Sequence, residues 1–470
     1  MKRFIFLNIC LWGLCYFSIA QDITGVWMGT LRVQNTELRL VLHINLSGMG
    51  YIATMDSPDQ GVYGIKVETI IMKDSLLSLK IPKLYMEYKG RYLSQDKIKG
   101  QFKQNGILIP LVLERSTSTD LTKTQVLRPQ TPVKPYPYYN EEVVFDNTEA
   151  NIHLAGTLSL PHKEGGCPAV ILISGSGAQN RDEEVFGHKP FEVIADYLTR
   201  NGIAVLRYDD RGVGQSTGQF EGATSFDFAS DVKAALKYLK SRKEINAKQI
   251  GLIGHSEGGL IAPLVAVDYK EVCFLVLLAG PGLPGGDILL QQQALIGHEQ
   301  GMSDSLIAQN KKWHTIIFDH IKNTKDPKVL EQVIIALVHE YANTQMPLDS
   351  MDAQQVEDIL NRQIRNILNP WMLNFIKYDP SVVLQKIKCP ILALNGEKDL
   401  QIAPKENLAA IKKALKKAKN KNVTIQELPN LNHLFQECSS GNPAKYREIE
   451  QTFSPKALQI ISDWIQKQIK

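Results

Sequence analysis

Gly254-His255-Ser256-Glu257-Gly258 is the stretch that decides how this chain folds. It follows a short apolar run at residues 249–254 and opens onto small and apolar residues at 258–266. A strand, a tight turn and a helix in that order are what a Gly-x-Ser-x-Gly nucleophile elbow requires, with the serine in a strained turn between two glycines. Such a short motif also arises by chance in a chain of 470 residues, so it needs partners before it indicates chemistry.

The first twenty residues have the pattern of an export signal. Lys2 and Arg3 precede an apolar run at 9–19, and small residues stand at Ser18 and Ala20. This pattern predicts a secretory signal peptide at residues 1–20 and a protein that works in the periplasm or outside the cell. The alternative is an uncleaved anchor helix, but the apolar run is short for a membrane span. No later segment is long and apolar enough to cross a bilayer, so we expect no stable membrane insertion after cleavage.

The composition is that of an ordinary globular protein. Hydrophobic residues make up 44% and charged residues 22% of the chain, and the formal charge is only +4. These values exclude a disordered chain and give no reason to expect a nucleic-acid partner. The four cysteines beyond the leader show no metal-ligand spacing, so neither a metal nor a cofactor is expected. They receive no disulfide assignment and are Cys167, Cys273, Cys389 and Cys438.

Two domains are expected in the mature chain. Residues 22–115 alternate short β-rich runs with turn residues and show no helical period, which predicts a small all-β barrel or sandwich. Residues 116–140 are rich in Pro, Ser and Thr and are typical of a linker. Residues 141–470 then alternate strand-like and helical runs after an opening hairpin, which predicts an α/β domain with a mostly parallel sheet of about eight strands. Residues 285–377 contain only amphipathic helical patterns and are expected to form a lid over the strand ends.

A serine nucleophile needs a histidine base and a carboxylate that orients it. In the elbow fold these residues follow the chain order serine, acid, histidine. Of the ten histidines, only His433 follows the helical insertion and the strand-like run at 391–395. Asp399 stands just after that run and is the favoured acid, with Glu397 as the alternative. The predicted triad is therefore Ser256, Asp399 and His433.

An oxyanion intermediate needs two fixed backbone N–H donors. One is expected from Glu257, immediately after the nucleophile. The other is expected from the glycine-rich loop Ser174-Gly175-Ser176-Gly177, with the N–H of Ser176 favoured and that of Gly175 second.

Five motifs in this order resemble the landmarks of the α/β-hydrolase superfamily. They are Ser174-Gly-Ser-Gly177, Arg207-Tyr-Asp-Asp-Arg-Gly-Val-Gly-Gln-Ser216, Gly254-His-Ser-Glu-Gly258, Gly396-Glu-Lys-Asp399 and Asn432-His433. Within the superfamily, residues 141–470 resemble EstD-like bacterial esterases and serine-aminopeptidase-like hydrolases. The resemblance implies an α/β-hydrolase fold with a lid before the acid strand. It also extends to the β-rich front domain, for which it implies no function.

The first of these loops departs from the family pattern at two positions. Ala178 and Asn180 stand where proline and aspartate are usual in relatives, whereas Gln179, Arg181 and Asp182 fit. The departures leave the expected oxyanion donors in place.

Two other patterns receive a structural interpretation. The run Asp209-Asp210-Arg211-Gly212-Val213-Gly214 lacks the lysine and the glycine spacing of a nucleotide loop and is expected to be a turn of the fold. The lysines at 412–417 lie opposite an apolar stripe, which predicts the solvated face of a packed helix.

The leading functional expectation is an exported serine hydrolase that cleaves small to medium acyl esters. The alternative within enzymes is a serine exopeptidase, with Glu331, Glu340 or Glu357 of the lid holding the amino terminus of a short peptide. An alternative of another class is a cell-surface or glycan-binding protein that uses the hydrolase fold as a scaffold. The sequence leaves open the acyl chain length, the physiological substrate, the role of the front domain and the oligomeric state.

Overall fold

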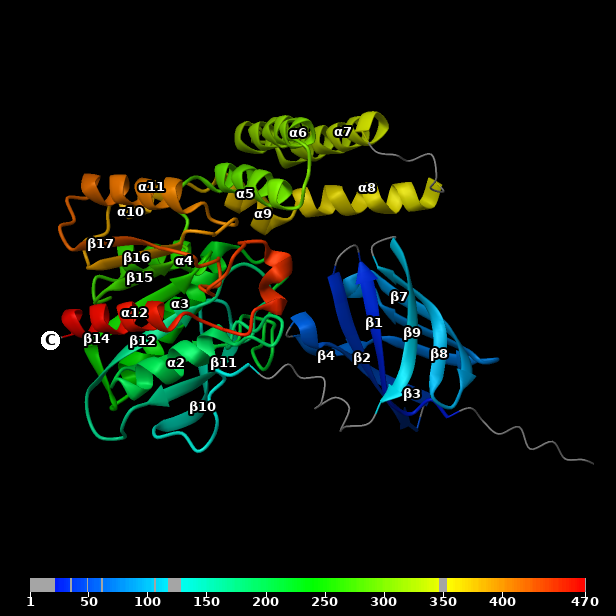
Figure 1. Ribbon diagram of the computed structural model, residues 1–470, viewed down its shortest axis with the longest axis horizontal. Helices are drawn as coiled ribbons and strands as arrows, with labels where there is room; N and C mark the ends of the chain where they lie inside the picture. Colours follow the sequence, from blue (N-terminus) through cyan, green and yellow to red (C-terminus); the bar gives the residue numbers. More distant parts are fainter. Residues whose placement is uncertain are drawn as a thin grey trace, which may run out of the picture.

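The computed structural model describes residues 22–33, 36–48, 50–60, 62–104, 107–116, 128–345 and 353–469. The signal peptide expected at residues 1–20 and residues 117–127 of the expected linker lie outside the described residues. Two β-sheets make up the frame of the chain, one from each of the two expected parts (Figure 1).

The first sheet is antiparallel and has the order β4-β3-β2-β1-β9-β8-β7-β6-β5. Its strands are β1 Gly25–Val33, β2 Thr36–Ser47, β3 Gly50–Ser57, β4 Val62–Val67, β5 Thr69–Lys73, β6 Leu76–Ile81, β7 Met86–Ser94, β8 Lys97–Gln104 and β9 Ile107–Ser116. Both edge strands lie against strands from the far half of the sheet, β5 against β3 and β4 against β6, so the sheet curls toward a barrel. Alternate side chains fill its interior, where Trp27 and Tyr88 are buried.

The second sheet has the order β10-β11-β13-β12-β14-β15-β16-β17. Its strands are β10 Tyr139–Asn147, β11 Ile152–Leu160, β12 Cys167–Ile173, β13 Ala204–Tyr208, β14 Ile245–His255, β15 Leu275–Leu278, β16 Ile391–Gly396 and β17 Val423–Leu428. The strands β12 to β17 are parallel, and the hairpin β10–β11 is antiparallel to its neighbours. The expected mostly parallel sheet of eight strands is confirmed, and its topology is that of the α/β-hydrolase fold.

Helices cover both faces of this sheet. Helices α2 Pro190–Arg200 and α12 Pro455–Gln468 pack on one face, and α3 Ser225–Ser241, α4 Gly258–Asp268 and α11 Pro404–Lys417 pack on the other. In α11, Ile411 and Leu415 are buried while Lys412 and Lys416 are exposed, which confirms the interpretation of the lysine run. Because strands β12 to β17 are parallel, their carboxyl ends lie at one edge of the sheet, and the loops that follow them meet there.

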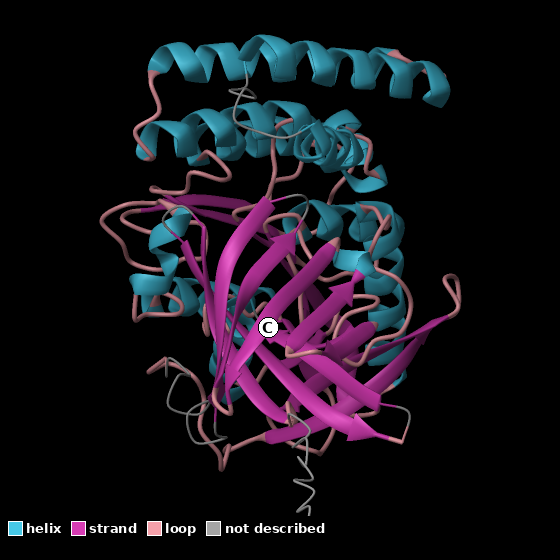
Figure 2. Cartoon of the chain, turned by 90° about the vertical axis from the view of Figure 1, so that its right-hand side faces the viewer, coloured by secondary structure: helices cyan, strands magenta, loops and turns pink. Residues whose placement is uncertain are grey.

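The chain between β15 and β16 forms a helical insertion. Its helices are α5 Gly285–Glu299, α6 Asp304–Asn323, α7 Pro327–Gln345, α8 Ala353–Ile367 and α9 Pro370–Lys377, and the short α10 Ser381–Leu384 leads back to the sheet. Buried side chains such as Ile317, Ile321 and Ile334 give the insertion its own core. Figure 2 shows these helices stacked on one side of the strands, and in Figure 1 helix α8 extends over the β-domain.

The four cysteines within the described residues are free thiols. Within the described ranges, no helix combines the length and the apolar character that a membrane span needs. The described part of the expected linker has no helix or strand before β10, yet it is fixed to the α/β domain. Gln130 accepts hydrogen bonds from the amides of Thr452 and Phe453.

Candidate active site

The turn between β14 and α4 has the geometry of a nucleophile elbow. Ser256 has a φ of 51°, a left-handed conformation that a non-glycine residue seldom adopts. A Cβ atom at Gly254 would lie 2.0 Å from the carbonyl oxygen of Gly258, and one at Gly258 would lie 2.1 Å from the carbonyl oxygen of Ile173. Both flanking positions therefore require glycine, because neighbouring backbone fills the space of a side chain.

His433 and Asp399 meet at the carboxyl edge of the sheet. His433 lies in the loop after β17, and its Nδ1 is 2.7 Å from Oδ2 of Asp399, which follows β16. The other carboxylate oxygen of Asp399 accepts hydrogen bonds from the backbone amides of Gln401 and Ile402, at 2.7 and 2.9 Å. Glu397, the alternative acid, is exposed and accepts the amide of Asn430 instead. With Nδ1 bound to the acid, Nε2 of His433 is the nitrogen that can accept a proton.

The two expected oxyanion donors belong to two different loops at the carboxyl edge of the sheet. Ser176 follows β12 and Glu257 begins the turn into α4, and both residues line the same cavity as Ser256. In the described chain, neither backbone amide has a hydrogen-bond acceptor. Gly175, the second choice, donates its amide to Oε1 of Glu183 at 2.7 Å. The amides of Ser176 and Glu257 are therefore the ones available to a ligand.

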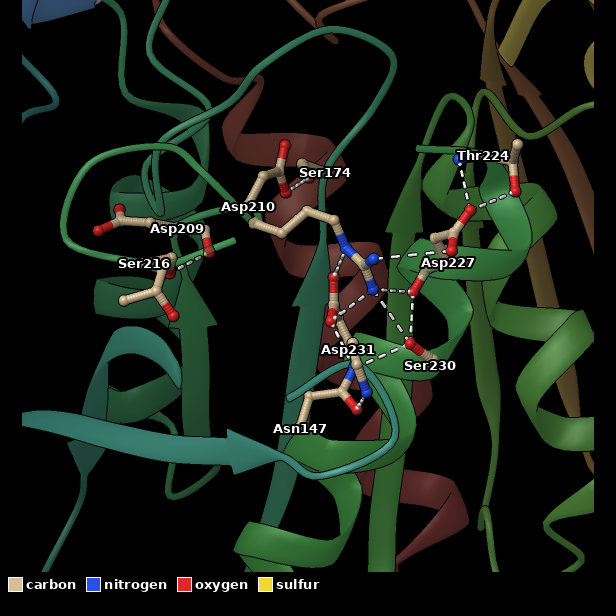
Figure 3. Close-up of polar contacts among 12 residues, drawn as sticks. Asn147, Ser174, Asp209, Asp210, Ser216, Thr224, Asp227, Ser230 and Asp231 are labelled. Carbon is tan, nitrogen blue, oxygen red and sulfur yellow. Dashed lines mark hydrogen bonds and ion pairs between the residues drawn. The ribbon is translucent and has the colours of Figure 1, made fainter. Parts of the chain in front are cut away.

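A buried carboxyl holds the loop after β12 in place. Figure 3 shows Ser174 and Asp210 facing one another, with a hydrogen bond of 2.7 Å between Ser174 Oγ and Asp210 Oδ1. The other oxygen of Asp210 accepts the amide of Gln179 at 2.9 Å. Burial raises the pKa of Asp210 to about 8, although these two hydrogen bonds oppose the shift.

The run at 209–214 is a turn of the fold, as expected. Arg211 donates from Nε and Nη2 to the two carboxylate oxygens of Asp231 in α3, at 2.8 and 2.9 Å. Asn147 and Ser230 complete this cluster in Figure 3. Asp209 likewise accepts the guanidinium of Arg181. These charged side chains form ion pairs with one another, which argues for a structural role.

A buried ion pair that no sequence pattern indicated lies next to Ser256. Nδ1 of His255 lies 2.9 Å from Oε1 of Glu183, and its Nε2 lies 3.0 Å from the carbonyl oxygen of His433. Burial alone would lower the pKa of His255, but the Glu183 carboxylate raises it above the ordinary value. Since both ring nitrogens face acceptors, the contacts favour the protonated form of His255. The pair thus connects three loops: that of Gly175, the elbow and that of His433.

The side chain of Glu257 also takes part in the site, whereas the elbow motif in the sequence points only to its backbone amide. Its Oε1 accepts two hydrogen bonds, one from Ser225 Oγ at 2.5 Å and one from Nε1 of Trp371 at 2.8 Å. Burial raises the pKa of Glu257, while the hydrogen bonds from Ser225 and Trp371 counteract part of the shift. Trp371 belongs to α9 and stacks on Phe375, so this bond fixes the insertion to the elbow.

A cavity of about 570 Å³ joins these groups. It is lined by Ser256 and His433 at the sheet edge and by Ile288, Trp371 and Phe375 of the insertion. Asp399 is 2% exposed and lies behind His433. The three carboxylates of the insertion that were expected to bind a peptide, Glu331, Glu340 and Glu357, are exposed and are not among the lining residues.

Two curated proteins are similar to parts of this chain. Esterase EstD of Thermotoga maritima is 24% identical over 300 residues, which cover 64% of this chain and 62% of EstD. The putative hydrolase YtaP of Bacillus subtilis is 31% identical over 128 residues, which cover 23% of this chain and 43% of YtaP. In both cases the match spans less than two thirds of the relative.

A solved structure and a family model also match parts of this chain. The Pyrococcus furiosus esterase Pf2001 matches with a TM-score of 0.42 and 17% identity, covering 74% of this chain and 99% of that chain. The family model described as serine aminopeptidase, S33 (Hydrolase_4) matches residues 189–437, a stretch that contains Ser256, Asp399 and His433. Because this match covers just over half of the chain, the protein belongs to the serine aminopeptidase S33 family of hydrolases.

Proposed function

We propose that this protein is an exported carboxylesterase that cleaves small to medium acyl esters with Ser256 as nucleophile, His433 as base and Asp399 as orienting acid. The observation that carries the proposal is the 2.7 Å contact between His433 and Asp399 at the wall of a cavity that Ser256 also lines. The similarity to esterase EstD supports an ester as the substrate.

The proposed acylation step begins with proton transfer from Ser256 Oγ to Nε2 of His433. The serine oxygen then attacks the ester carbonyl, and the amides of Ser176 and Glu257 stabilise the negative charge on the carbonyl oxygen. Asp399 remains ionised and stabilises the imidazolium of His433. The imidazolium next protonates the leaving alcohol, so that the C–O bond breaks and an acyl-serine remains.

Deacylation repeats these roles with water. His433 accepts a proton from the water molecule, whose oxygen attacks the acyl-serine carbonyl. The same two amides stabilise the second tetrahedral intermediate. Its collapse releases the carboxylic acid and returns the proton from His433 to Ser256.

The decisive test is Ser256→Ala. We expect p-nitrophenyl butyrate hydrolysis to fall by about 10⁴-fold or more, because the covalent intermediate can no longer form. A fluorophosphonate probe should label the wild type and not the variant, and Ser305→Ala, an exposed serine of α6, serves as the control. Normal turnover by Ser256→Ala would refute the proposal. Absence of labelling in the wild type would favour the binding-protein alternative.

The family description favours a second candidate, a serine exopeptidase. The same acyl-enzyme chemistry would serve a peptide bond, with an amine as leaving group. However, the exposed Glu331, Glu340 and Glu357 do not line the cavity, so they do not supply the site for a substrate ammonium that this candidate needs. Comparing kcat/KM for aminoacyl-nitroanilides and nitrophenyl esters separates the two. A preference for the anilides would reverse our choice.

Export and the lid role of α5 to α9 belong to the same proposal. The basic start and short apolar run of residues 1–20 support export, and N-terminal sequencing of secreted protein should begin at Gln21. Ile288 of α5 and Trp371 of α9 line the cavity, which supports a lid that covers the bound acyl group. Retention of the leader in the secreted protein would contradict cleavage after Ala20.

A further inference from the structure

The front β-domain contacts the catalytic domain through the 3₁₀ turn Pro58–Gln60. The backbone carbonyl of Asp59 accepts the amide of Phe186 at 3.0 Å. The Asp59 carboxylate accepts a hydrogen bond from Nη2 of Arg447 at 3.0 Å. Nη1 of Arg447 donates a second hydrogen bond to the backbone carbonyl of Glu37. One residue of the β-domain therefore holds two segments of the catalytic domain.

The Asp59 side chain is itself held in place by Arg39 of the β-domain. Arg39 donates its amide to Oδ2 of Asp59 at 2.8 Å and its Nη2 to Oδ1 at 2.6 Å. The Asp59 side chain is only 2% exposed, so the carboxylate has little freedom to follow a moving partner. A buried carboxylate between two guanidinium groups is a strong and geometrically specific contact.

The two segments that Asp59 holds are walls of the active-site cavity. Val185 and Phe186 line it from the loop before α2, and Ala444 and Tyr446 line it from the 3₁₀ turn Pro443–Glu448. Phe186 has a φ of 51°, which is strained for a bulky side chain. Such a conformation persists only where surrounding contacts enforce it, and the amide of Phe186 is bound by the β-domain.

The linker that leaves the β-domain reinforces the same walls. Arg128 is buried, and its Nη2 donates to the backbone carbonyls of Phe186 at 2.8 Å and Arg447 at 2.9 Å. Its Nη1 donates to the carbonyl of Ile449 at 2.7 Å. Both wall segments are thus held by residues that precede the catalytic domain in the sequence.

We propose that the front β-domain is a structural part of the active-site cavity, in which Asp59, through Arg447 and Phe186, positions the two walls that limit the size of the ester. The inference rests on the proposed esterase function for its kinetic readout. Asp59 and Arg447 are positioning residues, since neither lines the cavity. The β-domain then contributes to substrate choice without touching the substrate.

The test uses Arg447→Gln in the full chain, because both hydrogen bonds of the Arg447 guanidinium go to the β-domain. KM and kcat are measured for p-nitrophenyl acetate, butyrate and octanoate. We expect the ratio of the octanoate KM to the acetate KM to change by at least about threefold, with kcat for acetate within about twofold of the wild type. Arg447→Lys keeps the charge and should give an intermediate change. Lys97→Gln, which removes an exposed ion pair to Glu114 elsewhere on the β-domain, should change nothing.

Hydrogen–deuterium exchange provides a readout independent of turnover. Residues 183–188 and 443–448 should exchange faster in Arg447→Gln, or in Arg447→Lys if the glutamine variant does not fold. An unchanged KM ratio together with unchanged exchange would overturn the inference. If the wild type hydrolyses no ester, the proposed function fails, whereas the exchange experiment still tests the positioning of the walls.

Discussion

Glu183 and His255 form a buried ion pair between the elbow, the loop of Gly175 and the loop of His433. Glu183→Gln keeps the shape of the side chain and removes its charge. We expect kcat for p-nitrophenyl butyrate to fall by about 10- to 100-fold, because a hydrogen bond to a charged group contributes about 1.5–3 kcal/mol. KM should change little, since Glu183 orients groups around the reacting carbonyl.

The matched control for this variant is Glu149→Gln, an exposed carboxylate in the turn after β10. It should leave both constants at wild-type values. A Glu183→Gln protein with a lower melting temperature but an unchanged kcat would mean that the ion pair serves stability alone.

Asp210 makes stability depend on pH. Its folded pKa of about 8 lies above the ordinary value of 3.8, so the folded chain keeps a proton that the unfolded chain loses between these values. This contribution to stability is fully present below about pH 3.8 and is lost as the pH rises through 8. Asp210→Asn imitates the neutral acid, since it can donate to Ser174 and accept from Gln179. The free energy of unfolding of the wild type relative to this variant should therefore fall by up to about 1.4 kcal/mol per pH unit.

Urea titrations of both proteins at pH 5, 6.5 and 8 measure this difference. Comparing the two proteins removes the effects of other groups, such as His255 and Glu257, that titrate in both. A difference that stays constant over the three pH values would show that Asp210 does not change its protonation state in this range.

Ser256, Asp399 and His433 could be predicted from the sequence. A local motif identifies Ser256, and the order of the strands restricts which residues can be the acid and the histidine. The pair of Glu183 and His255 had no such signal. These residues are 72 positions apart, and they meet only because the loops after β12 and β14 fold over the same edge. His255 was visible only as the variable residue of the elbow motif.

At the scale of elements, helix α9 is fixed to the elbow by the Trp371–Glu257 hydrogen bond. Trp371→Phe removes the donor and keeps an aromatic ring to stack on Phe375. We expect KM for p-nitrophenyl butyrate to rise by about 3- to 10-fold, because α9 loses about 1 kcal/mol of attachment to the site. Trp313→Phe, in the core of the insertion and outside the cavity lining, is the control. Equal KM values for the two variants would contradict the idea that the Trp371–Glu257 hydrogen bond positions α9 at the site.

The elements that sequence predicted are those with a strong local pattern. The parallel strands are continuous apolar runs, and α6, α7 and α8 have clear amphipathic periods. Strand β7, with the sequence MEYKGRYLS, has only a weak pattern because charged residues and a glycine interrupt its alternation. Helix α9 has no separate pattern because it is only eight residues long and follows α8 almost directly.

At the scale of the whole molecule, sequence patterns could separate the β-domain from the catalytic domain but could not place one against the other. Domain docking depends on a few side chains, such as Asp59 and Arg447, that are 388 positions apart. Burial and periodicity within each domain carry no information about such contacts. The Pro-rich stretch that suggested a plain linker in fact contributes Arg128 and Gln130 to the catalytic domain.

The β-domain also touches the insertion, and this contact gives a prediction about lid motion. Lys103 of β8 lies 3.2 Å from Asp358 of α8, and the Arg365 guanidinium lies 4.4 Å from the Tyr85 ring centre. Both members of the ion pair are about one third exposed, so the pair contributes only about 0.2–1 kcal/mol. Hydrogen exchange in α8 should therefore speed up by about 1.5- to 5-fold in Asp358→Lys and in Lys103→Asp.

The double variant Lys103→Asp with Asp358→Lys restores opposite charges at the same two positions. Exchange in α8 should return toward the wild-type rate, because the attraction depends on the product of the charges and not on which side carries each. High salt should reduce the difference between the single variants and the wild type, since it screens a partly exposed pair. Asp304→Lys, an exposed charge change in α6 whose ion-pair partner is His298, is the control and should leave α8 unaffected. If the double variant exchanged as fast as the single ones, the contact between β-domain and insertion would not restrain α8, and the movement of the lid would be independent of the front domain.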